Sequence, residues 1–204
     1  MNYYSASPSR QTSERTTRRQ SRVRAVLARR QPDLTLVLAN IHDPHNVSAI
    51  YRSCDAFGLL RVHLYYTGTP FPVLSRKTSA SARKWVESVR HTNLKSLAEA
   101  MNGFQVLCTV CSASAIPLRK WDFTKSTAVI MGNEHSGVDA ELLQLSAGQL
   151  YIPMHGMIQS FNVSVAAAII LAEAARQREQ AGMYDQSRIP EHILLEKENE
   201  WLCK

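Results

Sequence analysis

The feature that most constrains this sequence is a set of short apolar runs that recur along the chain. The runs LTLVL at Leu34–Leu38 and TAVIM at Thr127–Met131 contain almost no polar side chains. A strand that is apolar throughout is typical of a parallel sheet covered on both faces. Stretches with helical spacing lie between such runs. We therefore predict an α/β fold, with a mostly parallel sheet and helices on both of its faces.

The same pattern predicts the remaining elements. Arg52 falls outside the apolar stripe of one helix, which consists of Val47, Ile50, Cys54 and Phe57. Gly58 is suited to end that helix. We expect further strands at 60–65, 85–91 (an edge strand), 104–110 and 150–152, helices at 21–30, 46–57, 94–101, 139–146, 160–181 and 189–202, and an irregular link at 116–125.

Three polar loops follow predicted strands. The first leads to Asn46, which can cap its helix, the second is GNEHSG at 132–137, and the third lies within 151–170. Ligand sites in parallel sheets form beyond the carboxyl ends of the strands. The three loops are therefore expected to meet at one edge of the sheet.

The third loop is expected to open a helix with small polar side chains in its first turn. Ser160 is a suitable N-cap, and Asn162 and Ser164 follow it. Free amides and the helix dipole favour a polar or anionic group at such a terminus. A capped helix with nothing bound explains the same residues, so this pattern leaves both interpretations open.

The net charge of +7 lies entirely in residues 1–30, which contain eight arginines and one acidic residue. A neutral body with a cationic arm indicates a polyanionic partner and favours nucleic acid. A solvated tail, an expression remnant or an organelle transit peptide are the alternatives. No apolar leader or membrane-spanning run is evident, so we expect a soluble, intracellular protein without a membrane partner.

Metal and dinucleotide sites are not expected. Cys108 and Cys111 have the spacing of a zinc pair, but no second pair completes it, and we predict buried reduced thiols. His42 and His45 likewise lack further ligands. The sequence after Leu38 has no glycine-rich turn, which argues against a Rossmann-type oxidoreductase.

The ordered motifs resemble a known family. Asn46 with Arg52, then GNEHSG, then IPM and SFNVSVAAA within 151–170 are similar to the three motifs of the SpoU branch of SPOUT RNA 2′-O-ribose methyltransferases. The resemblance covers about residues 33–184 and is strongest to bacterial members that methylate guanosine 18 of tRNA. Asp43 and His135 stand where lysine is common in the family.

The resemblance implies a C-terminal trefoil knot and bent S-adenosylmethionine within the knot loops. It also implies a cytoplasmic homodimer whose active site is completed across the interface. It further implies three parts, which are a basic arm (1–32), a SPOUT methyltransferase domain (33–184) and a C-terminal helical extension (185–204). The implied cofactor contacts, largely through the backbone, are Thr109, Gly132, Ile152, Met154 and Phe161.

The resemblance also implies roles for individual side chains. Arg52 has the activating role in the family; because a guanidinium is hardly deprotonated, we expect it to stabilise the developing 2′-oxyanion and hold a nearby phosphate. A helix-surface pair with Asp55 is the alternative. Asn46, Glu134, Ser160 and Asn162 are expected to shape the pocket and position Arg52. The expected tRNA-backbone contacts are Arg22, Arg30, Arg176 and Arg178.

Two other functions stay open at this point. A member of the same branch can act on ribosomal RNA or on the tRNA wobble nucleotide. A protein with this fold can also bind RNA without catalysis, although the complete set of Arg52, Glu134 and Asn162 argues against that.

Overall fold

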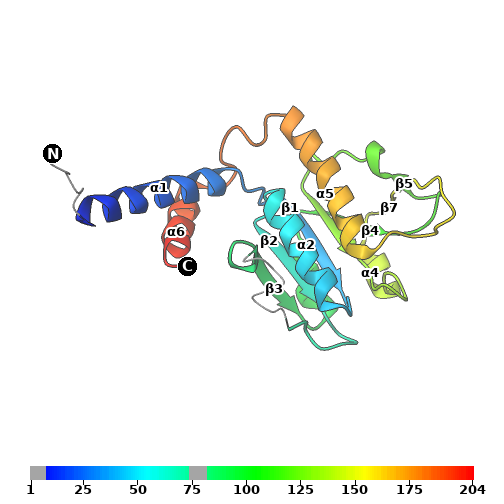
Figure 1. The fold of residues 1–204 in the computed structure, drawn as a ribbon. Helices are drawn as coiled ribbons and strands as arrows, with labels where there is room; N and C mark the ends of the chain where they lie inside the picture. Colours follow the sequence, from blue (N-terminus) through cyan, green and yellow to red (C-terminus); the bar gives the residue numbers. More distant parts are fainter. Residues whose placement is uncertain (1–7, 74–81) are drawn as a thin grey trace.

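The computed structural model describes residues 8–73 and 82–204, and side chains from residue 16 onward. The first seven residues of the predicted arm lie outside this description. Within the described residues a parallel sheet forms the centre of the molecule, as predicted (Figure 1). In chain order the elements are α1 (Pro8–Ala28), β1 (Leu34–Ala39), α2 (Pro44–Ala56), β2 (Arg61–Tyr65), η1 (Ala82–Lys84), β3 (Glu87–His91), α3 (Leu94–Ala100), β4 (Gln105–Thr109), β5 (Ile116–Pro117), η2 (Leu118–Lys120), β6 (Thr127–Met131), α4 (Ala140–Leu145), β7 (Gly148–Tyr151), α5 (Val163–Gln180) and α6 (Glu191–Leu202).

The strand order is β3-β2-β1-β6-β4-β7-β5, and every pairing is parallel. β1 and β6 lie at the centre, with Leu36 opposite Val129, and both are buried along their whole length. This explains their uninterrupted apolar sequences, because neither face of a central strand meets water. The predicted edge position of 85–91 is confirmed by β3.

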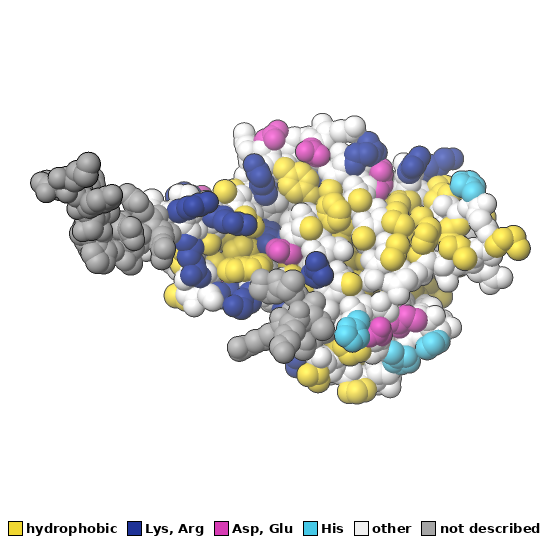
Figure 2. Space-filling model, viewed as in Figure 1, with side chains coloured by type: hydrophobic (Ala, Val, Ile, Leu, Met, Phe, Trp, Pro, Cys, Tyr) yellow, Lys and Arg dark blue, Asp and Glu magenta, His cyan; other side chains and the backbone are white. Residues whose placement is uncertain are grey.

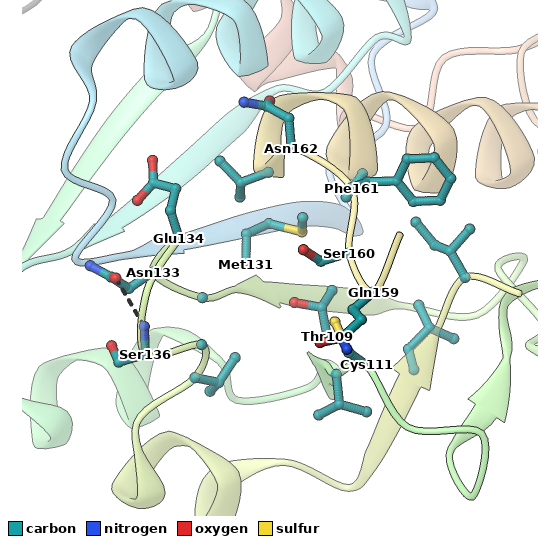
Figure 3. A pocket seen from close by; sticks show the side chains of 18 of the residues that line it. Thr109, Cys111, Met131, Asn133, Glu134, Ser136, Gln159, Ser160, Phe161 and Asn162 are labelled. Carbon is teal, nitrogen blue, oxygen red and sulfur yellow. Dashed lines mark hydrogen bonds between the residues drawn. The ribbon is translucent and has the colours of Figure 1, made fainter. Parts of the chain in front are cut away.

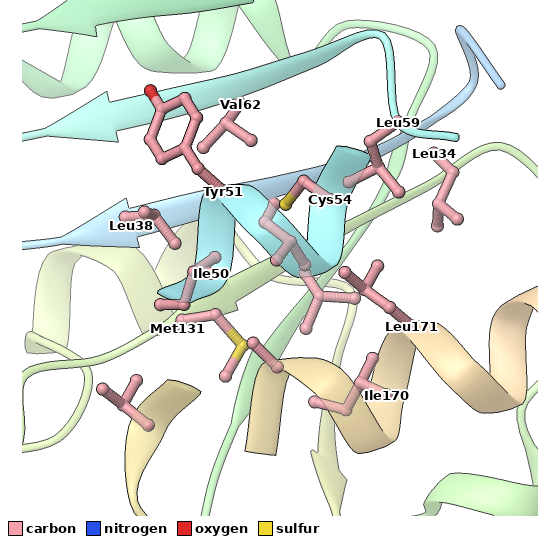
Figure 4. Packing of buried hydrophobic residues seen from close by; sticks show 14 of the residues in the cluster. Leu34, Leu38, Ile50, Tyr51, Cys54, Leu59, Val62, Met131, Ile170 and Leu171 are labelled. Carbon is pink, nitrogen blue, oxygen red and sulfur yellow. The ribbon is translucent and has the colours of Figure 1, made fainter. Parts of the chain in front are cut away.

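Helices cover both faces of the sheet, as predicted. α2 and α5 pack on one face, where Ile50 and Cys54 meet Ile170 and Leu171 (Figure 4). α3 and α4 cover the opposite face, where Leu97 is among the buried residues. The apolar stripe of α2 is buried as expected, although Phe57 is only half-buried.

Two predicted helix caps are wrong. α2 is capped by Asp43, whose carboxylate accepts from the amide of His45 at 2.8 Å, and not by Asn46. α5 is capped by Asn162, which accepts from the Ser164 amide at 2.9 Å, and Ser160 lies in the loop before it. In each case the residue directly before the first helical residue takes the capping role. Asn46 is thereby free for other contacts.

The irregular link predicted at 116–125 contains a short edge strand, β5, and the turn η2. Its last part lies against α5. The side chain of Gln177 accepts from the amide of Phe123 at 2.8 Å and donates to the carbonyl of Trp121 at 3.0 Å. The link, which precedes β6, is thereby fixed to a helix that follows β7.

α1 and α6 project together from one side of the sheet domain (Figure 1). Val23 and Leu27 of α1 share an apolar cluster with Leu194 and Trp201 of α6. The cluster also includes Leu60 and Trp85 of the sheet domain, so it attaches both ends of the chain to that domain. No helix in the described part of the chain is long and apolar enough to cross a membrane.

A buried histidine pair joins β2 to β3. Nδ1 of His63 lies 2.9 Å from Nε2 of His91, and both residues are at most 4% exposed. The other ring nitrogen of His63 has no hydrogen-bond partner among the described residues. Burial, together with the nearby His91 and Arg61, lowers the pKa of His63 from 6.5 to about 4.

This lowered pKa predicts a pH-dependent stability. Between pH 6.5 and 4 the unfolded chain binds a proton that native His63 excludes, so the free energy of unfolding decreases as the pH falls. We expect a decrease of up to about 3 kcal/mol, measured by urea unfolding at several pH values. The variant His63→Gln should show a shallower slope over this range. An unchanged slope would contradict the assignment.

Candidate functional site

A cavity of about 730 Å³ lies beyond the carboxyl ends of β4, β6 and β7, beside the start of α5 (Figure 3). Its volume is in the range of sites for small molecules and cofactors. All five residues predicted as cofactor contacts line it, namely Thr109, Gly132, Ile152, Met154 and Phe161. The structure therefore brings them together from three separate loops.

The GNEHSG loop forms one wall as a tight hairpin. The amide and carbonyl groups of Asn133 and Gly137 bind each other at 2.8 and 2.9 Å. The side chain of Asn133 accepts from the amide of His135 at 2.8 Å. A Cβ atom on Gly132 would overlap the backbone of Gly137 and Val138, so this close approach requires glycine.

A chain of hydrogen bonds joins the three polar loops. Nδ2 of Asn162 donates to Oδ1 of Asn46 at 3.0 Å, and Nδ2 of Asn46 donates to Oε1 of Glu134 at 2.9 Å. The other carboxylate oxygen accepts from the amide of His42 at 3.2 Å. The predicted meeting of the three loops is thus confirmed.

The carboxylate of Glu134 decides which groups donate and which accept in these hydrogen bonds. Burial raises the pKa of Glu134, but the hydrogen bonds from Asn46 and from backbone amides outweigh burial and lower the pKa overall. An ionised carboxylate can only accept, so Asn46 must present its amide nitrogen to Glu134 and its oxygen to Asn162. Glu134 therefore fixes both amides at the rim of the cavity.

Ser160 and Arg52 have different positions. Ser160 lines the cavity between Gln159 and Phe161 (Figure 3). Arg52 is exposed on α2 and is absent from the cavity wall of its own chain. Its side chain makes no hydrogen bond or ion pair with any residue in 8–73 or 82–204, and the alternative partner Asp55 pairs with Arg30 instead. The guanidinium of Arg52 is available to a ligand or a second subunit.

Of the four arginines predicted to contact RNA, two are exposed and two are buried. Arg22 is exposed on α1, and Arg176 is exposed on α5, where it pairs with Glu173 at 2.7 Å. Arg30 and Arg178 are fully buried, so their predicted RNA contacts are wrong. Arg178 pairs with Asp33 at 2.6 Å and donates to the carbonyl of Phe123 at 2.8 Å. Such side chains stabilise the fold and cannot reach a phosphate.

One residue that supports the site was missed from the sequence. Asn40 has a φ of 49°, and its side chain accepts from the amides of Thr67 and Gly68. Its carbonyl accepts from the side chain of Asn133 at 2.7 Å, which holds the GNEHSG hairpin. An asparagine directly after a strand was the available signal, because asparagine tolerates this backbone conformation.

Of the two cysteines with zinc-like spacing, only Cys108 is buried as predicted. Cys111 is exposed and lies on the cavity wall. Among the described residues there is no group of three or more His, Cys, Asp or Glu side chains placed to hold a metal ion.

Comparisons with known proteins agree with this geometry. Residues 33–172 match the SpoU rRNA Methylase family. The chain is 45% identical over 193 residues to the tRNA (guanosine(18)-2′-O)-methyltransferase of Thermus thermophilus, an alignment that covers 94% of this chain and 99% of the relative.

Solved structures have the same fold. A TrmH/SpoU tRNA modifying enzyme of Aquifex aeolicus matches with a TM-score of 0.85 at 37% identity, covering 92% of this chain and 96% of that one. An AdoMet-bound rRNA methyltransferase from Sinorhizobium meliloti matches with a TM-score of 0.63 at 26% identity, covering 76% of this chain and 59% of that one.

Proposed function

The chain belongs to the SpoU rRNA methylase family, and from this premise we propose that it transfers a methyl group from S-adenosylmethionine to the 2′-hydroxyl of guanosine 18 in tRNA. The Thermus relative, named for this reaction, aligns over nearly its whole length. The observation that carries the proposal is the joining of all three motifs at one cavity by the Asn162–Asn46–Glu134 hydrogen bonds.

The cavity fits the proposed cofactor. Its wall combines apolar side chains, such as Leu150 and Ile170, with polar groups of Thr109, Gln159 and Ser160. This combination suits an adenosine and an amino-acid group. S-adenosylmethionine supplies an electrophilic methyl group on a sulfonium, so the reaction requires no metal. Thr109, Gly132, Ile152, Met154 and Phe161 are the residues that would hold it.

The protein's own side chains then position and activate the ribose. A hydroxyl is a weak nucleophile, and negative charge develops on its oxygen during transfer. The guanidinium of Arg52 stabilises that charge and binds an adjacent phosphate. Glu134, Asn46 and Asn162 fix the rim against which the ribose docks, and Ser160 contributes a hydroxyl there. Arg52 is not assigned as a base, because it cannot accept a proton at physiological pH.

A homodimer completes the site. Arg52 does not line the cavity of its own chain, so we assign it to the cavity of the partner subunit. Exposed apolar side chains provide the contact surface, with Val165 on α5 and Met157 and Ile158 in the preceding loop. Figure 2 shows hydrophobic side chains gathered over α2 and α5. Large exposed apolar patches commonly mark such interfaces.

The family fold implies a trefoil knot in the C-terminal part. The likeness to the TrmH/SpoU tRNA modifying enzyme over 92% of this chain supports this expectation. The proposed division into arm (1–32), methyltransferase domain (33–184) and extension (185–204) is supported by the packing of α1 against α6 in a cluster distinct from the two that cover the faces of the sheet. We place the activity in the cytoplasm, as expected for an enzyme that modifies tRNA.

The basic arm is proposed to bind the tRNA backbone. Arg18, Arg19 and Arg22 are exposed on α1, and Figure 2 shows basic side chains along this projection. Changing all three to glutamate should raise KM for tRNA at least ~10-fold. With fewer protein cations, fewer counterions are released from the RNA phosphates on binding, and this release drives the association. Equilibrium binding of S-adenosylmethionine should stay unchanged. Lost cofactor affinity, or an unchanged KM, would contradict this role.

The function itself is tested by methyl transfer to an unmodified tRNA transcript. A matched transcript carrying 2′-deoxyguanosine at position 18 lacks only the acceptor hydroxyl and should accept no methyl group. Transfer to both transcripts would refute the proposed position. Transfer to ribosomal RNA fragments without transfer to either transcript would favour the ribosomal members of the branch, and transfer that maps to the wobble nucleotide of both transcripts would favour the wobble members.

A further inference from the structure

Arg30 lies between the end of α1 and the start of β1 and is fully buried. Its guanidinium binds the C-terminal end of α2. Nη2 pairs with Oδ1 of Asp55 at 2.5 Å, and Nη1 donates to the carbonyls of Leu59 and Asp55 at 2.9 and 3.3 Å. One side chain thus binds a carboxylate and two carbonyl groups around the last turn of α2.

This arrangement suits a helix terminus. The last carbonyls of a helix lack intrahelical partners and carry partial negative charge, which a cation neutralises. Charge-assisted bonds made by a rigid guanidinium also restrict the direction of the helix end. Asp55 is less than one helical turn beyond Arg52, so the fixed end of α2 includes the base of the Arg52 side chain.

The same guanidinium contacts the C-terminal extension. It lies 5.1 Å from the ring centroid of Trp201 on α6, and Nζ of Lys204 lies 5.8 Å from that centroid. Trp201 also packs against Trp85 at 5.0 Å. Arg30 therefore joins the arm, the catalytic domain and the extension at one point.

α2 is thus held at both ends. Asn46 ties its first turn to Glu134 and Asn162, and Arg30 ties its last turn to the arm. We propose that Arg30 is a positioning residue, which acts through Asp55 to fix α2 and so orient Arg52 for methyl transfer. This inference rests on the function proposed above, in which Arg52 is the group that meets the ribose.

Arginine-to-lysine replacement separates this role from RNA binding. Lysine binds phosphate well but cannot reproduce the forked contacts of Arg30 with Asp55 and Leu59. In Arg30→Lys we expect kcat to fall roughly 10-fold or more, because small displacements of a catalytic group are costly. KM for tRNA and the Kd of S-adenosylmethionine should stay within about twofold of wild type. Arg119→Lys, at an exposed position outside the arm, should leave all three unchanged.

Asp55→Asn is the second variant, because it keeps the shape and one acceptor while removing the charge. A kcat loss with unchanged tRNA KM, in protein whose thermal melt is cooperative, is the expected result for this variant also. Unchanged kcat in either folded variant overturns the proposal, as does a raised KM with normal kcat. Failure of both variants to fold would also overturn it, since Arg30 would then support the whole fold.

The wild-type assay separates the two proposals. Absence of methyl transfer by wild type refutes the proposed function. Wild-type transfer together with normal kcat in Arg30→Lys and Asp55→Asn refutes only the positioning role.

Discussion

Arg52→Ala is expected to lower kcat for tRNA methylation by about 10²–10³-fold, the range for removing a group that stabilises a developing oxyanion. The Kd of S-adenosylmethionine, measured by calorimetry, should stay near the wild-type value, because the proposed role of Arg52 is to bind the ribose oxygen and a phosphate, while other residues line the cofactor cavity. The fold should be unaffected as well, since the exposed side chain makes no hydrogen bond or ion pair with the described residues. Near-normal turnover would remove Arg52 from the mechanism.

Mixed dimers provide a sharper test of the same residue. Consider a dimer of one Arg52→Ala subunit and one Gly132→Ala subunit, the second of which binds cofactor poorly. If Arg52 serves the partner's cavity, this dimer contains one complete site, made of the intact cavity of the first subunit and Arg52 of the second. Co-expression of the two inactive variants under separate tags should then restore activity, to about a quarter of wild type for random pairing. If Arg52 serves its own chain, the mixed dimer should remain inactive. The experiment therefore tests the dimeric site independently of any interface mutation.

The sheet was predictable because its central strands carry a strong signal. Burial on both faces gives β1 and β6 uninterrupted apolar sequences, and the loops that follow parallel strands must meet at one edge. The helix starts were less predictable. Asp43 and Asn46 are both good caps, and only the distant carboxylate of Glu134 decides that Asn46 takes another role.

The buried arginines could not be recognised from local sequence. Arginine is mostly exposed, and a cluster of arginines next to an arm indicates RNA contacts. The partner of Arg30 is Asp55, and the partner of Arg178 is Asp33, which is 145 residues away in the sequence. Pairing over such separations depends on the fold itself. The sequence thus identified the residues of the cavity better than the roles of the cations around it.

Gly132→Ala is expected to produce the second large effect, a rise of at least ~10-fold in the Kd of S-adenosylmethionine. Gly132 does not have a left-handed backbone conformation, so alanine is excluded only by space. Its Cβ would lie under 3.0 Å from backbone atoms of Gly137 and Val138, which cannot rotate away as a flexible side chain can. Overpacking of this kind typically costs about 1–3 kcal/mol.

The GNEHSG hairpin can relieve the overlap only by opening, and its other contacts determine the consequence. Opening pulls Asn133 from the carbonyl of Asn40 and moves Glu134 away from Asn46, so the cavity wall and its rim are lost together. Gly156→Ala is the matched control, because a Cβ atom there would meet nothing within 4 Å. That variant should bind cofactor normally. Tight binding by Gly132→Ala would show that the cofactor does not depend on this hairpin, and the assignment of the cavity would then be wrong.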